Sequence, residues 1–149
     1  MINNGFEVMN NFDAEKPCEF ITGFAEMHYG KKLTYDRNGV GFVNDILDDA
    51  HRRFEAGLIS DRTINMLTFS VGIFIGRMLL LHGLSEKGYV WGKCEGQFCI
   101  GKPAGGEDQI VAFPLGKAYK HIKNGSEDSI LFFYYMVLAS ANQIKEEDI

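Results

Sequence analysis

The sequence predicts an α+β fold with three N-terminal helices, a three-stranded antiparallel meander, and two C-terminal helices packed on the sheet. Apolar residues recur at helical spacing before residue 83 and again after residue 114. Between these regions lie short segments rich in β-branched and aromatic residues, separated by brief turns. Helices and strands are therefore segregated along the chain, whereas a parallel sheet would require them to alternate.

Length and composition narrow the class of protein. With 149 residues, of which 46% are apolar and 13% aromatic, the whole chain is expected to form one domain with a proper core. A net charge of −5 disfavours nucleic acid as a partner, because phosphate binding needs a clustered positive field. Three cysteines do not make a disulfide framework, and the N-terminus lacks signal-peptide features. We therefore expect a cytoplasmic protein, with the first 12 or so residues flexible.

The first three helices follow from apolar spacing and capping residues. The first is predicted over 13–30, with Asp13 as its N-cap. The second, over 40–54, alternates apolar and charged residues as an amphipathic surface helix does. The third, over 61–83, is capped by Ser60 and is apolar on nearly every side. It is therefore predicted to be the central helix.

The third helix is also long enough to cross a bilayer, but Arg77 and His82 would then lie at membrane depth. A buried core helix is favoured, and no membrane partner is expected. Gly72 and Gly76 lie four residues apart, as in the dimerisation motif of membrane helices. In a core helix, the same spacing lets a neighbouring element approach closely.

The second half of the chain supplies the sheet and two further helices. Three strands are predicted over Tyr89–Cys94, Gln97–Gly101 and Gln109–Phe113, and their short connections favour antiparallel neighbours. A short helix over 114–124 follows, with a proline at its start and Asn-Gly at its end. The last helix, over 126–144, is nearly all apolar and is capped by Ser126.

Cys94 and Cys99 lie on opposite arms of the predicted hairpin, where they could face each other. A zinc site needs about four ligands, and the second pair is missing unless His82 and His121 complete it. Two ordinary strand thiols are therefore favoured over a redox pair, and a metal site is the weakest alternative. We expect no metal and no cofactor.

Tyr89 and Trp91 point to the same face of their strand, because side chains alternate along a strand. A role in the core is favoured for these rings. The alternative is an exposed sheet face on which a small ligand stacks.

Two charged clusters could carry function. The acidic cluster lies on the second predicted helix and comprises Asp45, Asp48, Asp49, His51 and Glu55. Side chains one turn apart share a face there, yet such pairs are usually solvated ion pairs. The basic cluster lies on the short helix and comprises Lys117, Lys120, His121 and Lys123. Helical spacing places Lys117, Lys120 and His121 on one face of that helix. These donors could bind an anionic group or the acidic surface of a partner, although a solvated helix flank is the simpler interpretation.

Part of the chain, about residues 60–138, resembles a family of small uncharacterised bacterial proteins defined only as a domain of unknown function. The resemblance rests on structural residues: Gly72, Gly76, Trp91, Phe113, Pro114, Lys117, Lys120, Gly125 and Asp128. The family tends to have an acidic residue where this chain has Arg77, so any role of that acid is absent here. Small acidic proteins of this type resemble immunity and other binding proteins of bacterial conflict systems, which is an analogy of type.

No nucleophile-and-base motif, phosphate-binding loop or dinucleotide motif occurs in the sequence. We therefore expect a non-enzymatic protein-binding module of bacterial, immunity-like type, whose partner is another protein. A homo-oligomer is compatible with the sequence. The alternatives are a small-ligand binder that uses the sheet face around Trp91 and a hydrolase with an unrecognised site.

Overall fold

The computed structural model describes residues 5–103 and 109–147. Its class is α+β, as the sequence predicts. The helices are α1 (Glu15–Tyr29), α2 (Arg37–Glu55), α3 (Asp61–Leu79), α4 (Pro114–Asn124) and α5 (Ile130–Glu147). The strands are β1 (Phe6–Val8), β2 (Val90–Cys94), β3 (Gln97–Lys102) and β4 (Gln109–Ala112). Three short helical turns complete the fold: η1 (Leu80–Leu84), η2 (Ser85–Lys87) and η3 (Gly125–Asp128).

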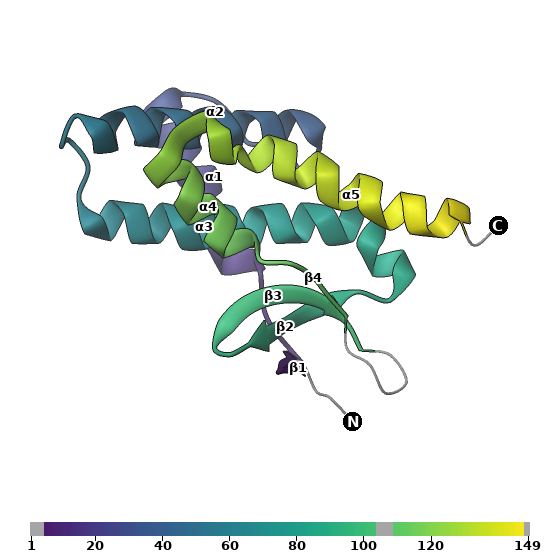
Figure 1. The fold of residues 1–149 in the computed structure, drawn as a ribbon. Coiled ribbons are helices and arrows are strands. Elements are labelled where there is room, and N and C mark those ends of the chain that lie inside the picture. The colour runs from purple at the N-terminus through teal and green to yellow at the C-terminus, as the bar shows by residue number, and fades with distance from the viewer. Residues whose placement is uncertain (1–4, 104–108, 148–149) are drawn as a thin grey trace.

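Helix α3 is the central element, as predicted. It packs against α1, α2, α4 and α5, and most of its apolar side chains are fully buried. The sheet lies on one side of α3, with α2 and α5 on the other, and α1 crosses behind it (Figure 1). Gly72 and Gly76 allow the close approaches expected of them, to Leu115 and Trp91 respectively.

The sheet has four antiparallel strands among the described residues, in the order β1-β2-β3-β4. The prediction of a three-stranded meander therefore missed one strand. The additional strand, β1, lies within the segment expected to be flexible. It pairs with β2, and the Phe6 ring covers Gly92 and Gly101. Because both glycines lack a side chain, the ring reaches the sheet backbone and becomes buried. Residues 1–4 lie outside the described part of the chain.

Only one of the two C-terminal helices packs closely on the sheet. Helix α4 contacts β3, whereas α5 packs mainly against α2, α3, α4 and η1. The expectation that both helices cover the sheet is therefore wrong for α5. The physical reason is that α3 and α4 lie between α5 and the strands, and α5 buries its apolar side against helices.

Helix boundaries follow local hydrogen bonds. Ser60 caps α3 as predicted, since its hydroxyl accepts from the Thr63 amide at 3.1 Å. Asp13 accepts from the Glu15 amide, but the N-cap residue of α1 is Ala14. The last helix begins at Ile130 rather than at 126, because η3 forms a separate turn.

One helical segment, Asp61–Lys87, is long and apolar enough to span a membrane by length and composition alone, with a hydropathy of 1.8. Within this fold, 61% of that apolar window is buried. Packing in the core therefore accounts for its apolar character.

Candidate functional site

The structure separates the four residues of the predicted basic site. The imidazole of His121 is fully buried and points into the protein, so it shares no exposed face with the lysines. Lys117 forms an ion pair with Asp128 at 2.9 Å. Lys123 lies over the Phe54 ring, with Nζ 4.1 Å from the ring centroid. These contacts give three of the four residues structural partners and contradict a shared face for Lys117, Lys120 and His121.

Lys120 is the most open member of the cluster. It is exposed and lines a shallow cavity of about 580 Å³ together with Lys117. The walls of this cavity are Gln97, Val111, Ala112, Phe113, Gly116 and Phe133. The anion site therefore reduces to one exposed lysine beside a second that is already paired.

His121 is the centre of a buried hydrogen-bond network. Its Nδ1 accepts from the Ile130 amide at 3.1 Å, so the ring proton sits on Nε2, which donates to Asp48 Oδ1 at 2.7 Å. Both ring nitrogens are thus occupied in the neutral form. Through these hydrogen bonds, His121 connects α4 to α2 and accepts from one of the first backbone amides of α5, which has no partner within its own helix.

The same network contains a serine but no catalytic arrangement. Ser129 donates to Asn44 Oδ1 at 2.9 Å, not to His121. The Leu131 amide also donates to Asn44, and the Phe132 amide donates to Ser129. Since the acceptor nitrogen of His121 is already bonded to a backbone amide, it cannot take a proton from Ser129. These residues cap α5 and fix it on α2.

The acidic cluster on α2 is likewise divided among structural contacts. Asp48 binds His121, and Asp49 binds side chains of α1 and α2. His51 donates through Nδ1 to the Ile122 carbonyl at 2.9 Å. In the described part of the chain, no group of three or more His, Cys, Asp or Glu side chains could hold a metal ion.

Tyr89 and Trp91 are core residues, each only 8% exposed. The Trp91 indole packs edge-on against Phe12 and Phe98 on one side and reaches the Gly76 backbone on the other. Since each ring is so deeply buried, neither has an open face for a stacked ligand.

The two hairpin cysteines do not face each other. In the observed register, Cys94 pairs with Gln97, while Cys99 pairs with Gly92, so the thiols are offset by two residues. None of the three cysteines forms a disulfide. Burial, aided by the nearby Cys94, raises the pKa of Cys99 to about 11, so its thiol stays protonated near neutral pH.

An apolar groove lies beside α1, at a place where no site was predicted from the sequence. It has a volume of about 460 Å³ and follows α1 from Glu19 to His28, with the first turns of α3 as its other wall. Its apolar lining comprises Phe20, Phe24, Met27, Met66 and Leu67. Met27 is 81% exposed and Met66 is 38% exposed.

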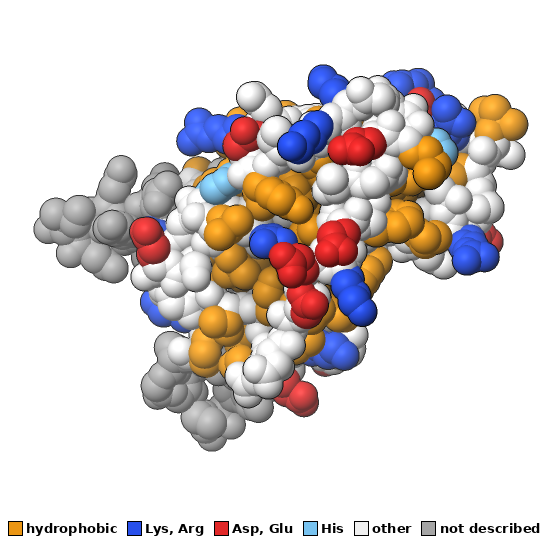
Figure 2. Space-filling model, turned by 180° about the vertical axis from the view of Figure 1, so that it is seen from behind, with side chains coloured by type: hydrophobic (Ala, Val, Ile, Leu, Met, Phe, Trp, Pro, Cys, Tyr) orange, Lys and Arg blue, Asp and Glu red, His pale blue; other side chains and the backbone are white. Residues whose placement is uncertain are grey.

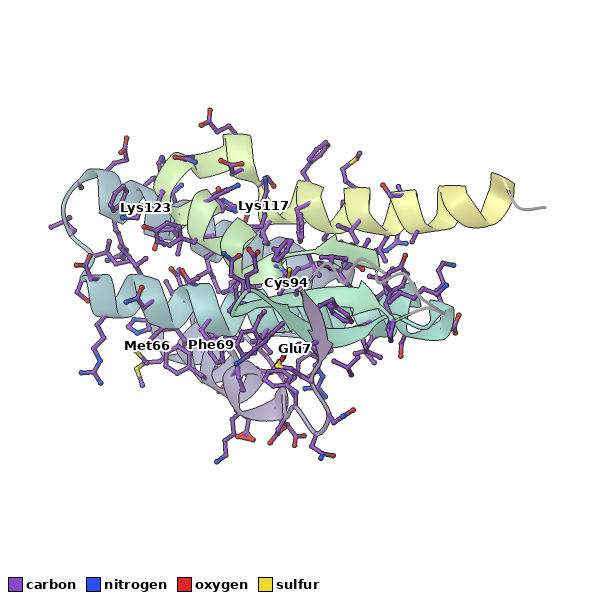
Figure 3. All side chains as sticks on the ribbon, turned by 60° about the horizontal axis from the view of Figure 1, so that its bottom comes forward. Glu7, Met66, Phe69, Cys94, Lys117 and Lys123 are labelled. Carbon is purple, nitrogen blue, oxygen red and sulfur yellow. The ribbon has the colours of Figure 1, made fainter. Side chains whose placement is uncertain are left out.

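The figures place this groove on the side of α3 away from the lysines. Met66 and Phe69 extend from α3 toward the α1 side, whereas Lys117 and Lys123 project from α4 on the other side (Figure 3). Seen from the side of α1, apolar side chains gather on the surface between charged ones (Figure 2). This face therefore differs from an ordinary solvated helix flank.

A polar cavity of about 390 Å³ adjoins the groove between α1, α2 and the loop before α3. Phe24, His28, Thr63 and Leu67 line both spaces, so the two are neighbours. At the polar end, Asp49 accepts from Tyr29 at 2.7 Å and from Arg53 Nε at 3.0 Å. Burial and the Asp49 hydrogen bond raise the pKa of Tyr29 to about 12.

The sequence contains one signal that could have located the groove. The apolar residues Phe20, Ile21, Phe24 and Met27 recur at helical spacing along the first predicted helix. The observed core face is Cys18, Ile21 and Ala25, a neighbouring stripe of smaller residues. A helix with two adjacent apolar stripes can bury only one of them in its own fold.

Comparison of the chain with family models, curated proteins and solved structures finds no match.

Proposed function

We propose that this protein is a non-enzymatic binding module that docks a partner protein in the groove along α1. The observation that carries the proposal is the apolar groove itself, which leaves Met27 and Met66 open to solvent beside charged residues. Contiguous apolar surface rimmed by polar groups is typical of protein interaction sites. Methionine favours such surfaces because its flexible side chain adapts to different partners.

The two alternative functions have weaker support. A small ligand would find no open ring face at Trp91, so it would have to use the polar cavity at Asp49 instead. A hydrolase would need a nucleophile beside an available base, and Ser129 and His121 are each committed to other partners. The immunity-like character suggested by the resemblance stays a prediction.

Comparative affinity capture from the source cell tests the proposal. Wild-type protein is compared with a Met27→Glu, Met66→Glu double variant, in which the groove carries two negative charges. Met136→Glu on α5 is the matched control, because Met136 is also a half-exposed methionine, at 48%. Proteins retained by wild type and by the control should be lost from the double variant. Retention of the same proteins by all three would contradict the proposal.

A stability measurement must accompany the capture. Exposed methionines contribute little to folding, so both the double variant and the control should unfold within about 0.5 kcal/mol of wild type. If the double variant loses its partners while its stability is unchanged, the loss is caused by the altered groove and not by unfolding.

A further inference from the structure

The charges along the groove indicate the kind of partner that fits it, given the proposed function. Glu19 lines one end. Arg53 lines the polar cavity that adjoins the other end, where Asp49 binds both Arg53 and Arg52, so the two arginines exceed the single carboxylate by one positive charge. Asp61 and Arg62, at the start of α3, are adjacent and of opposite sign. The groove is therefore apolar in the middle, negative at one end and positive at the other.

The length of the groove fits a helix. Along α1, the groove and the adjoining polar cavity together run from Glu19 to Tyr29, ten residues apart, which corresponds to about 15 Å or roughly three helical turns. Apolar side chains of α1 recur there at Phe20, Phe24 and Met27, at steps of four and three. An amphipathic partner helix presents anchors at the same spacing.

We infer that the groove along α1 binds an amphipathic helix of a partner protein, with a basic side chain over Glu19 and an acidic side chain over Arg53. The apolar stripe of that helix covers Met27 and Met66 and excludes water from them. The Arg53 guanidinium keeps donors for an acidic group, because among the described residues its hydrogen bond is the one from Nε to Asp49 Oδ2, at 3.0 Å. The charges at the two ends select the register of the helix more than they strengthen its binding.

A selection from a peptide library tests this inference. The probe is a display library of about 16-residue peptides, long enough for four turns, with leucines fixed at helical spacing and the other positions randomised. Enriched peptides should have an acidic and a basic residue about ten positions apart, matching that length along α1. Their affinity, measured by fluorescence anisotropy, should fall at least about tenfold on Met66→Glu.

A charge exchange in the protein provides the matched control. In the double variant Glu19→Arg, Arg53→Glu, a peptide with its two charges interchanged should bind about as well as the original peptide binds wild type. Each mismatched pairing should be weaker by about fivefold at low salt, and the difference should shrink as salt is added. Met27→Glu, at a fully open position, replaces Met66→Glu if the latter unfolds.

The outcomes separate this inference from the proposed function on which it rests. Peptides that lose affinity on Met66→Glu but show no charge pattern, or the reverse pattern, would overturn the inference and leave the proposed function standing. An absence of enriched peptides, or binding indifferent to Met66→Glu, would overturn the inference, whereas the proposed function fails only if the double variant retains its partners in the capture experiment. A dimer of the isolated protein in sedimentation, abolished by Met66→Glu, would assign the groove to a second copy and also overturn the inference.

Discussion

The Trp91 indole lies directly against the backbone of Gly76: a Cβ atom at that glycine would stand 2.1 Å from Cη2 of the ring. This contact joins the sheet to the central helix, and it depends on a residue with no side chain. Gly72 plays the same role toward Leu115 of α4, with a Cβ separation of 2.7 Å. The four-residue glycine spacing is therefore explained by packing within the fold.

Gly76→Ala should lower the free energy of unfolding by about 1–3 kcal/mol, because the new methyl group forces the indole and β2 away from α3. Gly41→Ala is the control. Gly41 lies inside α2 with no heavy atom within 4 Å of its would-be Cβ. Alanine there should stabilise the protein by about 0.5–1 kcal/mol through its higher helix propensity. Urea unfolding of both variants measures the effects, and equal stability of the two would contradict the packing account.

The ion pair of Lys117 with Asp128 should give the folded protein an acid-dependent stability. Hydrogen bonds from Lys117 and then from Asn124 lower the pKa of Asp128. A carboxyl with a lowered folded pKa contributes stability above its unfolded pKa, and that contribution is lost as the pH falls through the folded value. Lys117→Met should therefore destabilise the protein at neutral pH and cease to do so in acid.

Lys120→Met is the matched control for this measurement, since Lys120 is exposed and is only a minor influence on Asp128. It should change stability little at either pH. The effects of the two substitutions are compared by measuring the unfolding midpoint of each variant at neutral and at acidic pH. A loss for Lys117→Met that persists unchanged in acid would contradict the ion pair with Asp128 as its cause.

Much of the fold could be predicted from the sequence, because apolar spacing and glycine or proline punctuation are local signals. The central helix, its Ser60 cap and the hairpin of β2 and β3 follow from such signals. Strand β1 could not be found this way. It has three residues, and its burial depends on Gly92 and Gly101, which lie far along the chain.

The candidate sites were harder to predict, since a side chain's role depends on partners distant in sequence. His121 and Asp48 are 73 residues apart, and no local pattern joins them. Helical spacing placed His121 with Lys117 and Lys120, yet the packing of α2 against α4 buries it. On α1, the spacing grouped Met27 with Ile21 but could not show that the core buries Ile21 and leaves Met27 exposed.

Tyr29 should titrate far above an ordinary tyrosine. Its pKa is raised from 10 to about 12, first by burial and then by the hydrogen bond to Asp49. Because the folded pKa is the higher one, the contribution of Tyr29 to stability is full below pH 10 and is lost as the pH rises toward about 12. Carbon NMR of labelled tyrosine measures the pKa of Tyr29 in the folded protein. The same measurement on Asp49→Asn should give a lower Tyr29 pKa. An unchanged pKa in that variant would exclude the hydrogen bond as a cause.

All three cysteines should be reduced thiols, so protein unfolded without reductant and shielded from air should give a thiol count of three. In the folded protein, Cys99 should react with alkylating agents much more slowly than an exposed thiol, because it is buried and its pKa is about 11. Mass spectrometry after timed alkylation measures both. A count of one, with a mass two units low, would reveal a disulfide and contradict the observed register.

The most direct test of the groove as the docking surface is an NMR titration of the labelled protein with a helical peptide selected for binding. The account predicts amide shift changes concentrated in residues 19–29 of α1 and 60–67 at the start of α3, with smaller changes near Arg53. Amides of α4 around Lys120 and of α5 around Met136 should stay at their free positions. Shift changes centred on α4 or α5, with α1 unaffected, would contradict the account.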